Sequence, residues 1–341
     1  MTSRFENFLH TFDEKNWDEI IHQLLPAIHE VDRDTVQIWF RFFPLSLFTY
    51  LQNTEDKAAT LHGFAMQGKY ELKDQIDDSH NFIYGHRFWG ETKHAISSRV
   101  DSFDTEKGDI TEEVKQLAKS VAMSVKVDES VTTAIVLVGL MTLRQVGIDA
   151  FKSAKGETKF SASLLKKSAK QVLEERGKND SQGIFGFLKT IDKKWTVNFE
   201  SNAERGSFTA TELEEMTTAA MKCEVKIDER CYEGPIPVEC KAASCGTCWI
   251  GVIGGKERLN DVPPLERKAM KNFGYKQDNE AKPFMRLACQ AKVSGGVSVV
   301  IPAWNGVFGK KVYGNTLNNI LEPATTSAKK LREVIATAVK D

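Results

Sequence analysis

A short loop with three cysteines constrains this chain more than any other feature of its sequence. Cys240, Cys245 and Cys248 have the spacing C-x4-C-x2-C, and Cys289 follows after 40 intervening residues. All six cysteines lie from Cys223 onward, within a span of 67 positions. In a reducing compartment, such a cluster indicates metal binding or redox chemistry more than disulfide bonds.

The spacing of these four cysteines is one of those known for a two-iron two-sulfur (2Fe-2S) cluster, which four thiolates hold. Most of the ligands then come from a tight loop. The small residues of this loop are Ala242, Ala243, Ser244, Gly246 and Thr247. Small side chains let the backbone approach the cluster and direct its N–H groups at the sulfurs. We therefore predict that Cys240, Cys245, Cys248 and Cys289 bind one 2Fe-2S cluster.

Three stretches resemble parts of the plant- and vertebrate-type 2Fe-2S ferredoxins. IPVECKAASCGTC at 236–248 resembles their cluster loop, GVIGG at 251–255 the strand and turn after it, and RLACQ at 286–290 the segment of the last ligand. The resemblance covers residues 194–302 and places the four cysteines on the family's ligand positions. It implies a β-grasp fold, transfer of single electrons and a low reduction potential, roughly −400 mV in the plant type. The stretch before Cys240 is longer than in a minimal ferredoxin, and the 40-residue interval is nearer to the vertebrate type.

The charge of this region departs from the family. Many of its members are strongly acidic and use that charge to meet basic reductases. Residues 191–312 instead carry 18 basic and 16 acidic side chains. A nearly neutral domain loses most long-range steering. We therefore expect a redox partner that is held permanently, or one that is the chain's own N-terminal part.

Other interpretations of the cysteines stand beside this one. A zinc ribbon usually has two C-x2-C pairs, and this chain has one. A disulfide set is not expected in a reducing compartment. Cys223 and Cys231 are interpreted as packed side chains rather than ligands. Trp249, next to Cys248, is expected either to point outward as an interface anchor or to be covered by the helical lobe or the C-terminal helix.

The sequence as a whole predicts an α+β multidomain chain. Residues 1–150 form an all-α lobe, with helical periodicity at 16–31 behind an expected cap at Asn16 and a central apolar helix at 129–151. Residues 151–193 are a basic helical linker, 194–312 a β-grasp 2Fe-2S ferredoxin-like domain, and 313–341 a C-terminal tail helix. The first 150 residues carry 15 basic and 24 acidic side chains.

Residues 194–312 alternate between polar and apolar side chains in several places. This pattern predicts strands at 194–200, 223–231 and 297–302, and another after Cys248. One short helix is expected near 209–222, capped by Thr209 or Thr211, and a second begins at Pro263.

The helical lobe contains two Glu-x-x-His pairs, Glu19/His22 and Glu91/His94. Di-iron bundles use this unit twice, so a second metal centre fed by the ferredoxin domain is one alternative. An isolated helix histidine is more often a cap or a solvent-facing residue. The other histidine groups that could bind haem or zinc are His22 with His29, and His80 with His86 and His94.

We therefore expect a one-electron carrier with a single 2Fe-2S cluster, docked to a larger redox complex through its helical lobe. The sequence has no dinucleotide fingerprint and no P-loop, so a self-contained enzyme is not expected. The alternatives are an oxidoreductase whose helical lobe binds a second metal or haem, and an assembly or sensor protein that uses the cluster as a switch. The expected partners are redox proteins and not nucleic acid.

No transmembrane segment is expected. The apolar stretch 35–52 is interrupted by Arg41 and Pro44, and the stretch 132–143 is too short to span a bilayer. The first residues lack the charged region and the apolar core of a signal peptide. The sequence therefore predicts a cytoplasmic protein.

Overall fold

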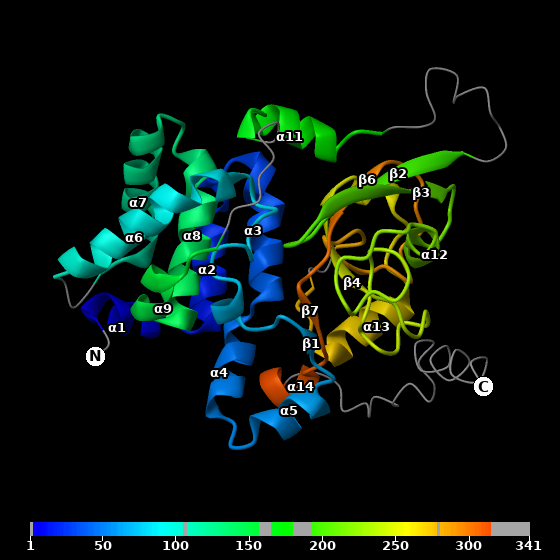
Figure 1. Ribbon diagram of the computed structural model, residues 1–341, viewed down its shortest axis with the longest axis horizontal. Helices are drawn as coiled ribbons and strands as arrows, with labels where there is room; N and C mark the ends of the chain where they lie inside the picture. The colour runs from blue at the N-terminus through cyan, green and yellow to red at the C-terminus, as the bar shows by residue number, and fades with distance from the viewer. Residues whose placement is uncertain (1–2, 105–107, 157–164, 180–192, 278–279, 315–341) are drawn as a thin grey trace. The chain divides into compact units, whose positions relative to one another are not determined.

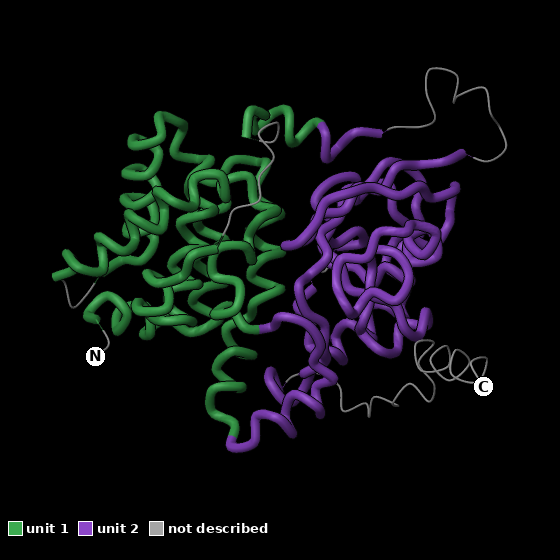
Figure 2. Tube along the Cα trace, viewed as in Figure 1, with its two compact units in different colours: residues 1–54, 71–174 green, residues 55–70, 175–341 purple. Residues whose placement is uncertain are grey.

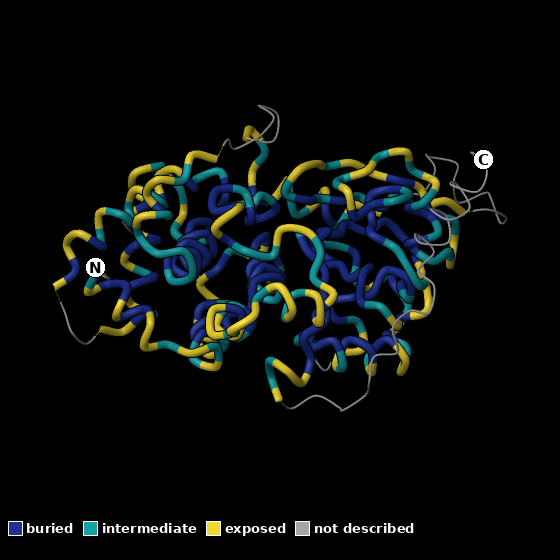
Figure 3. Tube along the Cα trace, turned by 60° about the horizontal axis from the view of Figure 1, so that its bottom comes forward, coloured by how far each residue is buried: buried dark blue, intermediate teal, exposed yellow. Residues whose placement is uncertain are grey.

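The computed structural model describes residues 3–104, 108–156, 165–179, 193–277 and 280–314 of the 341-residue chain. The chain divides into two compact units (Figure 2). Unit 1 comprises Met1–Thr54 and Glu71–Glu174, and unit 2 comprises Glu55–Tyr70 and Glu175–Asp341. Buried residues run through the interior of each unit (Figure 3).

The described part of unit 1 consists of helices (Figure 1). They are α1 (Arg4–His10), α2 (Glu14–Leu24), η1 (Leu25–Ala27), α3 (Glu30–Phe42), α4 (Leu45–Asn53), η2 (Leu72–Asp74), η3 (Tyr84–Phe88), α6 (Trp89–Ser102), α7 (Ile110–Val125), α8 (Ser130–Val146) and α9 (Ile148–Ser153). A further helix, α11 (Ala169–Arg176), crosses the boundary between the units.

Helix α8 is the centre of unit 1. It contacts α1, α3, α6, α7 and α9, and its residues from Val131 to Leu143 are buried. A helix that is apolar on every side is stable only inside such a shell of other helices. The predicted central helix is therefore present, but it ends at Val146, and Gly147 with a φ of 79° separates it from α9.

The first predicted helix begins earlier than expected. Helix α2 starts at Glu14, and the Asp13 side chain accepts a hydrogen bond from the Asn16 backbone N–H. In return, the Asn16 side chain accepts one from the Asp13 N–H. The expected cap at Asn16 is therefore wrong, because a capping box uses a polar residue at each end of the first turn and Asp13 is the outer one.

Unit 2 contains a mixed five-stranded sheet with the order β3-β2-β6-β4-β5. Strand β2 pairs antiparallel with β3 and parallel with β6, and β4 pairs antiparallel with both β6 and β5. The strands are β2 (Lys194–Glu200), β3 (Arg205–Thr211), β4 (Trp249–Gly254), β5 (Met285–Leu287) and β6 (Val297–Val300). The helices are α5 (Lys57–Gly63), α12 (Met216–Ala220), η5 (Lys256–Arg258), α13 (Pro264–Phe273) and α14 (Gly309–Tyr313). The predicted tail helix at 313–341 falls, from residue 315 onward, outside the residues that the structure describes.

Residues 55–70 belong to unit 2, unlike the predicted boundary at residue 150. Strand β1 (Gln67–Gly68) pairs with β7 (Trp304–Asn305). The Val307 N–H donates to the Phe64 carbonyl at 2.7 Å, and Phe64 is 1% exposed. Hydrophobic period does not reveal a strand pair that joins such distant residues, so the sequence assigned this segment to the helical lobe.

Two local predictions in unit 2 are wrong. Residues 223–231 form no strand, because Asp228 accepts from the Arg230 N–H and makes a turn. Thr209 and Thr211 lie in β3 rather than at a helix cap. Helix α12 begins only at Met216, after a turn that includes Leu213 at φ 59°. The strands β2, β4 and β6 and helix α13 lie where they were predicted.

No helix within the described residues is both long enough and apolar enough to cross a membrane.

Candidate functional site

The four predicted ligands come together in unit 2 as two pairs. The thiols of Cys240 and Cys245 share a hydrogen bond, and so do those of Cys248 and Cys289. The two pairs also interact electrostatically. Cys245 raises the pKa of Cys248, and Cys240 raises the pKa of Cys289. The loop before β4 and the turn after β5 are joined where the Ala288 N–H donates to the Cys248 carbonyl at 2.9 Å.

The loop backbone turns its N–H groups toward the first cysteine. Lys241 and Ala243 both have a left-handed φ of 54°. Left-handed residues that alternate with ordinary ones direct successive N–H groups to one side and create a hollow that attracts anions. The N–H groups of Ala242 and Ser244 donate to Cys240 Sγ at 3.3 and 3.4 Å. The small loop residues therefore have the role that the sequence predicts for them.

Aromatic side chains support the loop from within unit 2. The Tyr275 hydroxyl lies 3.0 Å from the Gly246 carbonyl, and its ring stacks on Trp249 with the centroids 4.2 Å apart. Trp249 is 1% exposed and donates through Nε1 to the Trp304 carbonyl at 3.1 Å. The outward orientation considered for Trp249 is therefore wrong. Other parts of unit 2, around Tyr275 and Trp304, cover this side chain.

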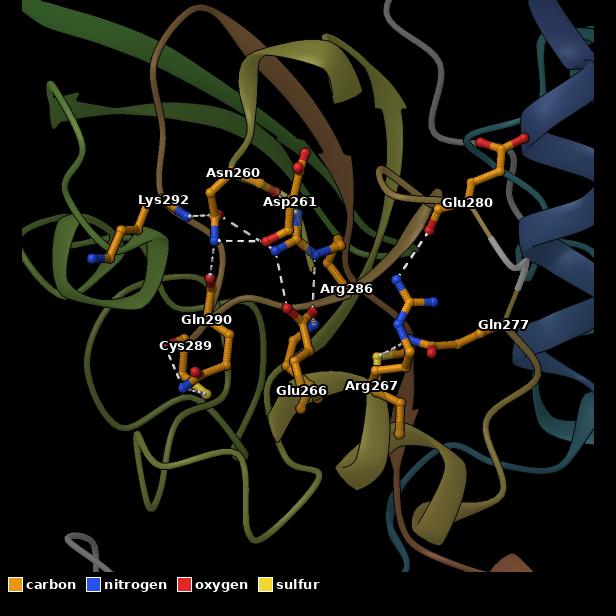
Figure 4. Close-up of polar contacts among 12 residues, drawn as sticks. Asn260, Asp261, Glu266, Arg267, Gln277, Glu280, Arg286, Cys289, Gln290 and Lys292 are labelled. Carbon is orange, nitrogen blue, oxygen red and sulfur yellow. Dashed lines mark hydrogen bonds and ion pairs between the residues drawn. The ribbon is translucent and has the colours of Figure 1, made fainter. Parts of the chain in front are cut away.

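A buried ion pair holds the segment of the last cysteine (Figure 4). Arg286 is 1% exposed and makes two hydrogen bonds of 2.9 Å to the fully buried Glu266 of α13. The same carboxylate accepts from the Leu287 N–H at 2.6 Å. The Gln290 amide donates to Cys289 Sγ at 3.5 Å. Helix α13 thus fixes the backbone two residues before Cys289, and Gln290 adds a side-chain donor to its sulfur.

The cysteine pairs share protons unequally. The hydrogen bond from Cys245 lowers the pKa of Cys240, while burial opposes this shift. The hydrogen bond from Cys248 likewise lowers the pKa of Cys289. The same hydrogen bonds, together with burial, raise the pKa of Cys245 and Cys248. Each pair therefore holds one thiolate readily, and a bound metal displaces the second proton.

The four thiols match the ligand set of a 2Fe-2S cluster in number and kind. Structural zinc needs four ligands around a single ion, whereas four thiolates share two irons in a 2Fe-2S cluster. Two adjoining thiol pairs with backbone N–H donors fit such a cluster.

A comparison with known families agrees with this geometry. Residues 214–294 match the family described as the 2Fe-2S iron-sulfur cluster binding domain. The chain carries a 2Fe-2S domain. The matched range contains Cys240, Cys245, Cys248 and Cys289, and the predicted resemblance and cofactor are confirmed. No curated protein and no solved structure matches the chain.

The other two cysteines of the 2Fe-2S domain differ from these four. Cys231 is 4% exposed, and its thiol donates to the Pro235 carbonyl at 3.3 Å. Burial raises the pKa of Cys231, which keeps it protonated and unreactive. Cys223 is half-buried. Packing therefore describes Cys231 well, as the sequence predicts.

The Glu-x-x-His pairs of unit 1 do not face a common interior. Glu19, His22, Glu91 and His94 are all exposed. A di-iron bundle needs such pairs to project inward. His29 has a structural role, because its Nδ1 accepts from the Val31 N–H at 3.2 Å at the start of α3.

His80 and His86 are the two candidate histidines that unit 1 does bring together. Both are buried, and their Nδ1 atoms lie 2.5 Å apart. The His80 ring also packs against Trp89 with the centroids 4.2 Å apart. Among the described residues no third side chain completes a metal site here.

Sequence reasoning missed the residues that hold the cysteines in place. Tyr275 and the Glu266–Arg286 pair are unremarkable in sequence, and only their burial reveals them. Arg286 and Gln290 nevertheless stand in the RLACQ stretch that carries the resemblance. A polar residue next to a ligand cysteine is a sequence signal for a hydrogen-bond donor to the sulfur.

Proposed function

We propose that this protein is a cytoplasmic one-electron carrier whose 2Fe-2S cluster is held by Cys240, Cys245, Cys248 and Cys289. The observation that carries the proposal is the meeting of these thiols in two adjoining pairs inside a 2Fe-2S domain. The bound cluster supplies a centre that accepts and releases one electron. A group of cysteines with this metal-ligand spacing is typical of a reducing compartment.

We assign unit 2 to the β-grasp class. The strand order β3-β2-β6-β4-β5 supports this assignment, with β2 and β6 as a parallel central pair between antiparallel neighbours. The sheet holds the cysteine loop at the start of β4 and the last cysteine just after the neighbouring strand β5. A rigid support of this kind keeps the ligands in place when the charge of the cluster changes.

Within this proposal, the chain's own residues have three tasks. The N–H groups of Ala242 and Ser244 stabilise negative charge on Cys240 in both oxidation states. Tyr275 and Trp249 exclude water from the inner side of the loop. The Glu266–Arg286 pair positions the segment that brings in Cys289.

We propose that unit 1 docks the carrier to a larger redox complex. It contains an open groove of about 650 Å³ between α6 and α7, whose lining includes the polar and charged side chains of Glu91, His94, Ser98 and Gln116. Met123 of α7 is 71% exposed. These features support a role in binding for this unit.

Substitution of single cysteines tests the ligand assignment. The protein isolated without oxygen should contain about two irons and about two sulfides per chain. Cys245→Ser should lose most of the visible absorption, because one iron loses a thiolate. Cys223→Ser is the matched control and should keep the spectrum. A normal spectrum for Cys245→Ser would contradict the assignment.

A further inference from the structure

The charges of the 2Fe-2S domain are separated along the chain, although their sum is nearly zero. Residues 200–239 hold ten acidic and four basic side chains, while residues 241–311 hold five acidic and twelve basic ones. Net charge therefore understates the electric field of this domain. Separate patches of opposite sign can steer partners even when the total charge is small.

Six of the twelve basic side chains of residues 241–311 lie on or next to two helices that contact each other. Helix α13 contacts α14. A Cβ placed on Gly274, just after α13, would lie 2.6 Å from the Gly309 nitrogen at the start of α14. Residues 263–277 and 302–314 contain one acidic side chain, Glu266, which is buried against Arg286. The six cations of these two segments, called here the basic face, are Arg267, Lys268, Lys271, Lys276, Lys310 and Lys311.

Several of these cations are not neutralised by the fold. Lys268, Lys271 and Lys310 are exposed, and within the described residues none of them has an acidic side chain at ion-pair distance. In the 200–239 stretch, Glu214 is paired with Lys222 and Asp228 with Arg230. The basic face therefore exposes positive charge that no described carboxylate neutralises, and this charge is separate along the chain from the acidic stretch.

The basic face also carries apolar contacts that a protein partner can use. Leu265 is 55% exposed and lies one turn before Lys268 on the same side of α13. At the other end, the Lys276 ammonium lies 5.7 Å from the centre of the half-buried Tyr313 ring. An apolar or aromatic anchor surrounded by charge is the usual composition of a protein interface.

A series of ring contacts joins this face to the residue that follows Cys248. Trp249, which follows Cys248, stacks on Tyr275 at 4.2 Å between ring centres. Phe308 lies 6.0 Å from Tyr275 and 5.8 Å from Tyr313. Packed side chains therefore fill the space between the ligands and the surface at α14.

From these observations we propose that the basic face of α13 and α14 is the docking surface for an acidic redox protein. This inference rests on the proposed electron-carrier function. One electron leaves the reduced cluster and enters the oxidised centre of the partner, and no proton or atom moves with it. The sign of the surface is the reverse of the one that the ferredoxin resemblance implies.

The test uses the full-length protein with its cluster and two small oxidants of opposite charge. The anion ferricyanide should oxidise the reduced protein faster at low than at high ionic strength, because the basic face attracts it. The triple variant Lys268→Glu/Lys271→Glu/Lys310→Glu should slow this reaction about tenfold at low salt. It should also speed oxidation by the cation hexaamminecobalt(III).

The matched control is Lys193→Glu/Lys194→Glu/Lys292→Glu, which changes the charge equally at exposed lysines elsewhere in unit 2. It should leave both rates nearly unchanged. Equal effects of the two triple variants, or a ferricyanide rate that rises with salt, would overturn the proposal. The iron and sulfide content is measured first, so that loss of the cluster, which would count against the proposed function, is distinguished from loss of docking.

Binding provides a readout that does not depend on electron transfer. A labelled oligoglutamate peptide should bind the wild-type protein in fluorescence anisotropy, and the Lys268/Lys271/Lys310 variant should lose that binding. The control variant should retain it. Tighter binding of a DNA duplex of matched charge at the same lysines would overturn the choice of an acidic protein as partner.

Discussion

Gly246 leaves no room for a side chain beneath the cysteine loop. Its φ of 71° is left-handed, and a Cβ there would lie 2.9 Å from Val307 Cγ1 and 3.2 Å from Tyr275 Oη. The sequence analysis explains the small residues of this loop by the close approach of the backbone to the cluster. The structure adds a second reason, the packed side chains beneath Gly246. The neighbours below the loop come from residues 27 and more positions away, so only the structure reveals the second constraint.

Gly246→Ala should therefore destabilise unit 2 by about 1–3 kcal/mol, because the new methyl group meets packed atoms. Urea unfolding followed by loss of the visible absorption measures this effect. Gly90→Ala is the control, since a Cβ at Gly90 meets nothing within 4 Å. In a helix that change should be neutral or stabilising. Equal stability of the Gly246 variant and the wild type would contradict the packing described here.

His80 makes the stability of unit 1 depend on pH. Burial lowers the pKa of His80 from 6.5 to about 3, Asp77 and the Ile76 backbone oppose this shift, and Lys93 adds to it. His86 faces it from the same segment. The folded unit keeps His80 neutral, whereas the unfolded chain binds a proton below pH 6.5. Stability is therefore fully present above that pH and is lost as the pH falls from 6.5 toward 3.

The expected loss approaches about 1.4 kcal/mol for each pH unit within this window. Urea unfolding at pH 7 and pH 5, followed by tryptophan fluorescence, measures it. His80→Phe should make the two stabilities more alike, and His22→Asn, at an exposed position, should not. A pH dependence that survives His80→Phe unchanged would assign the effect to other groups.

At the scale of single elements, the sequence predicts those helices and strands whose position depends on the period of their apolar residues. Strand β2 buries Trp195, Val197 and Phe199, so its alternation is a reliable signal. The stretch 223–231 alternates in the same way, yet Asp228 closes a turn there and the buried Arg230 donates to the Pro302 carbonyl. Local side-chain hydrogen bonds compete with strand formation, and period alone does not record them.

The contact between α13 and β5 depends on one buried ion pair. Glu266→Met should cost about 3–5 kcal/mol, because it leaves the Arg286 charge buried without a partner. The double variant Glu266→Met/Arg286→Met should recover much of that loss. Thermal unfolding and retention of iron measure both effects. A single variant no less stable than the double variant would refute this role for the pair.

The surface pair Lys115 and Glu112 is the control for that experiment. Both side chains are largely exposed and lie on one helix. Lys115→Met should change stability little, because solvent screens such pairs.

For the whole molecule, the division into units does not follow the order of the chain. Residues 55–70 precede most of the helical unit and yet supply β1, Phe64 and Met66 to unit 2. Composition predicts a helical half and a cysteine-bearing half, and both exist. The exchange of one segment between them depends on pairing with β7, which no local pattern encodes.

Phe64→Ala should therefore weaken the 2Fe-2S domain from a position that the sequence assigns to the helical lobe. Phe64 is 1% exposed and lies 6.4 Å from Phe308 between ring centres. Its truncation should cost about 3–5 kcal/mol and lower the temperature at which the visible absorption bleaches. His62→Ala, at an exposed position of α5, is the control and should have little effect. If the visible absorption of the Phe64 variant bleached at the wild-type temperature, residues 55–70 would not contribute to the stability of the 2Fe-2S domain.

The central claim is that four thiolates in two pairs hold one redox-active cluster. Electron paramagnetic resonance of the protein, reduced with dithionite without oxygen, tests it most directly. We expect a silent oxidised state and a reduced state whose signal integrates to about one unpaired electron per chain, as a single 2Fe-2S cluster requires. A colourless protein that contains zinc and gives no signal after reduction would contradict it.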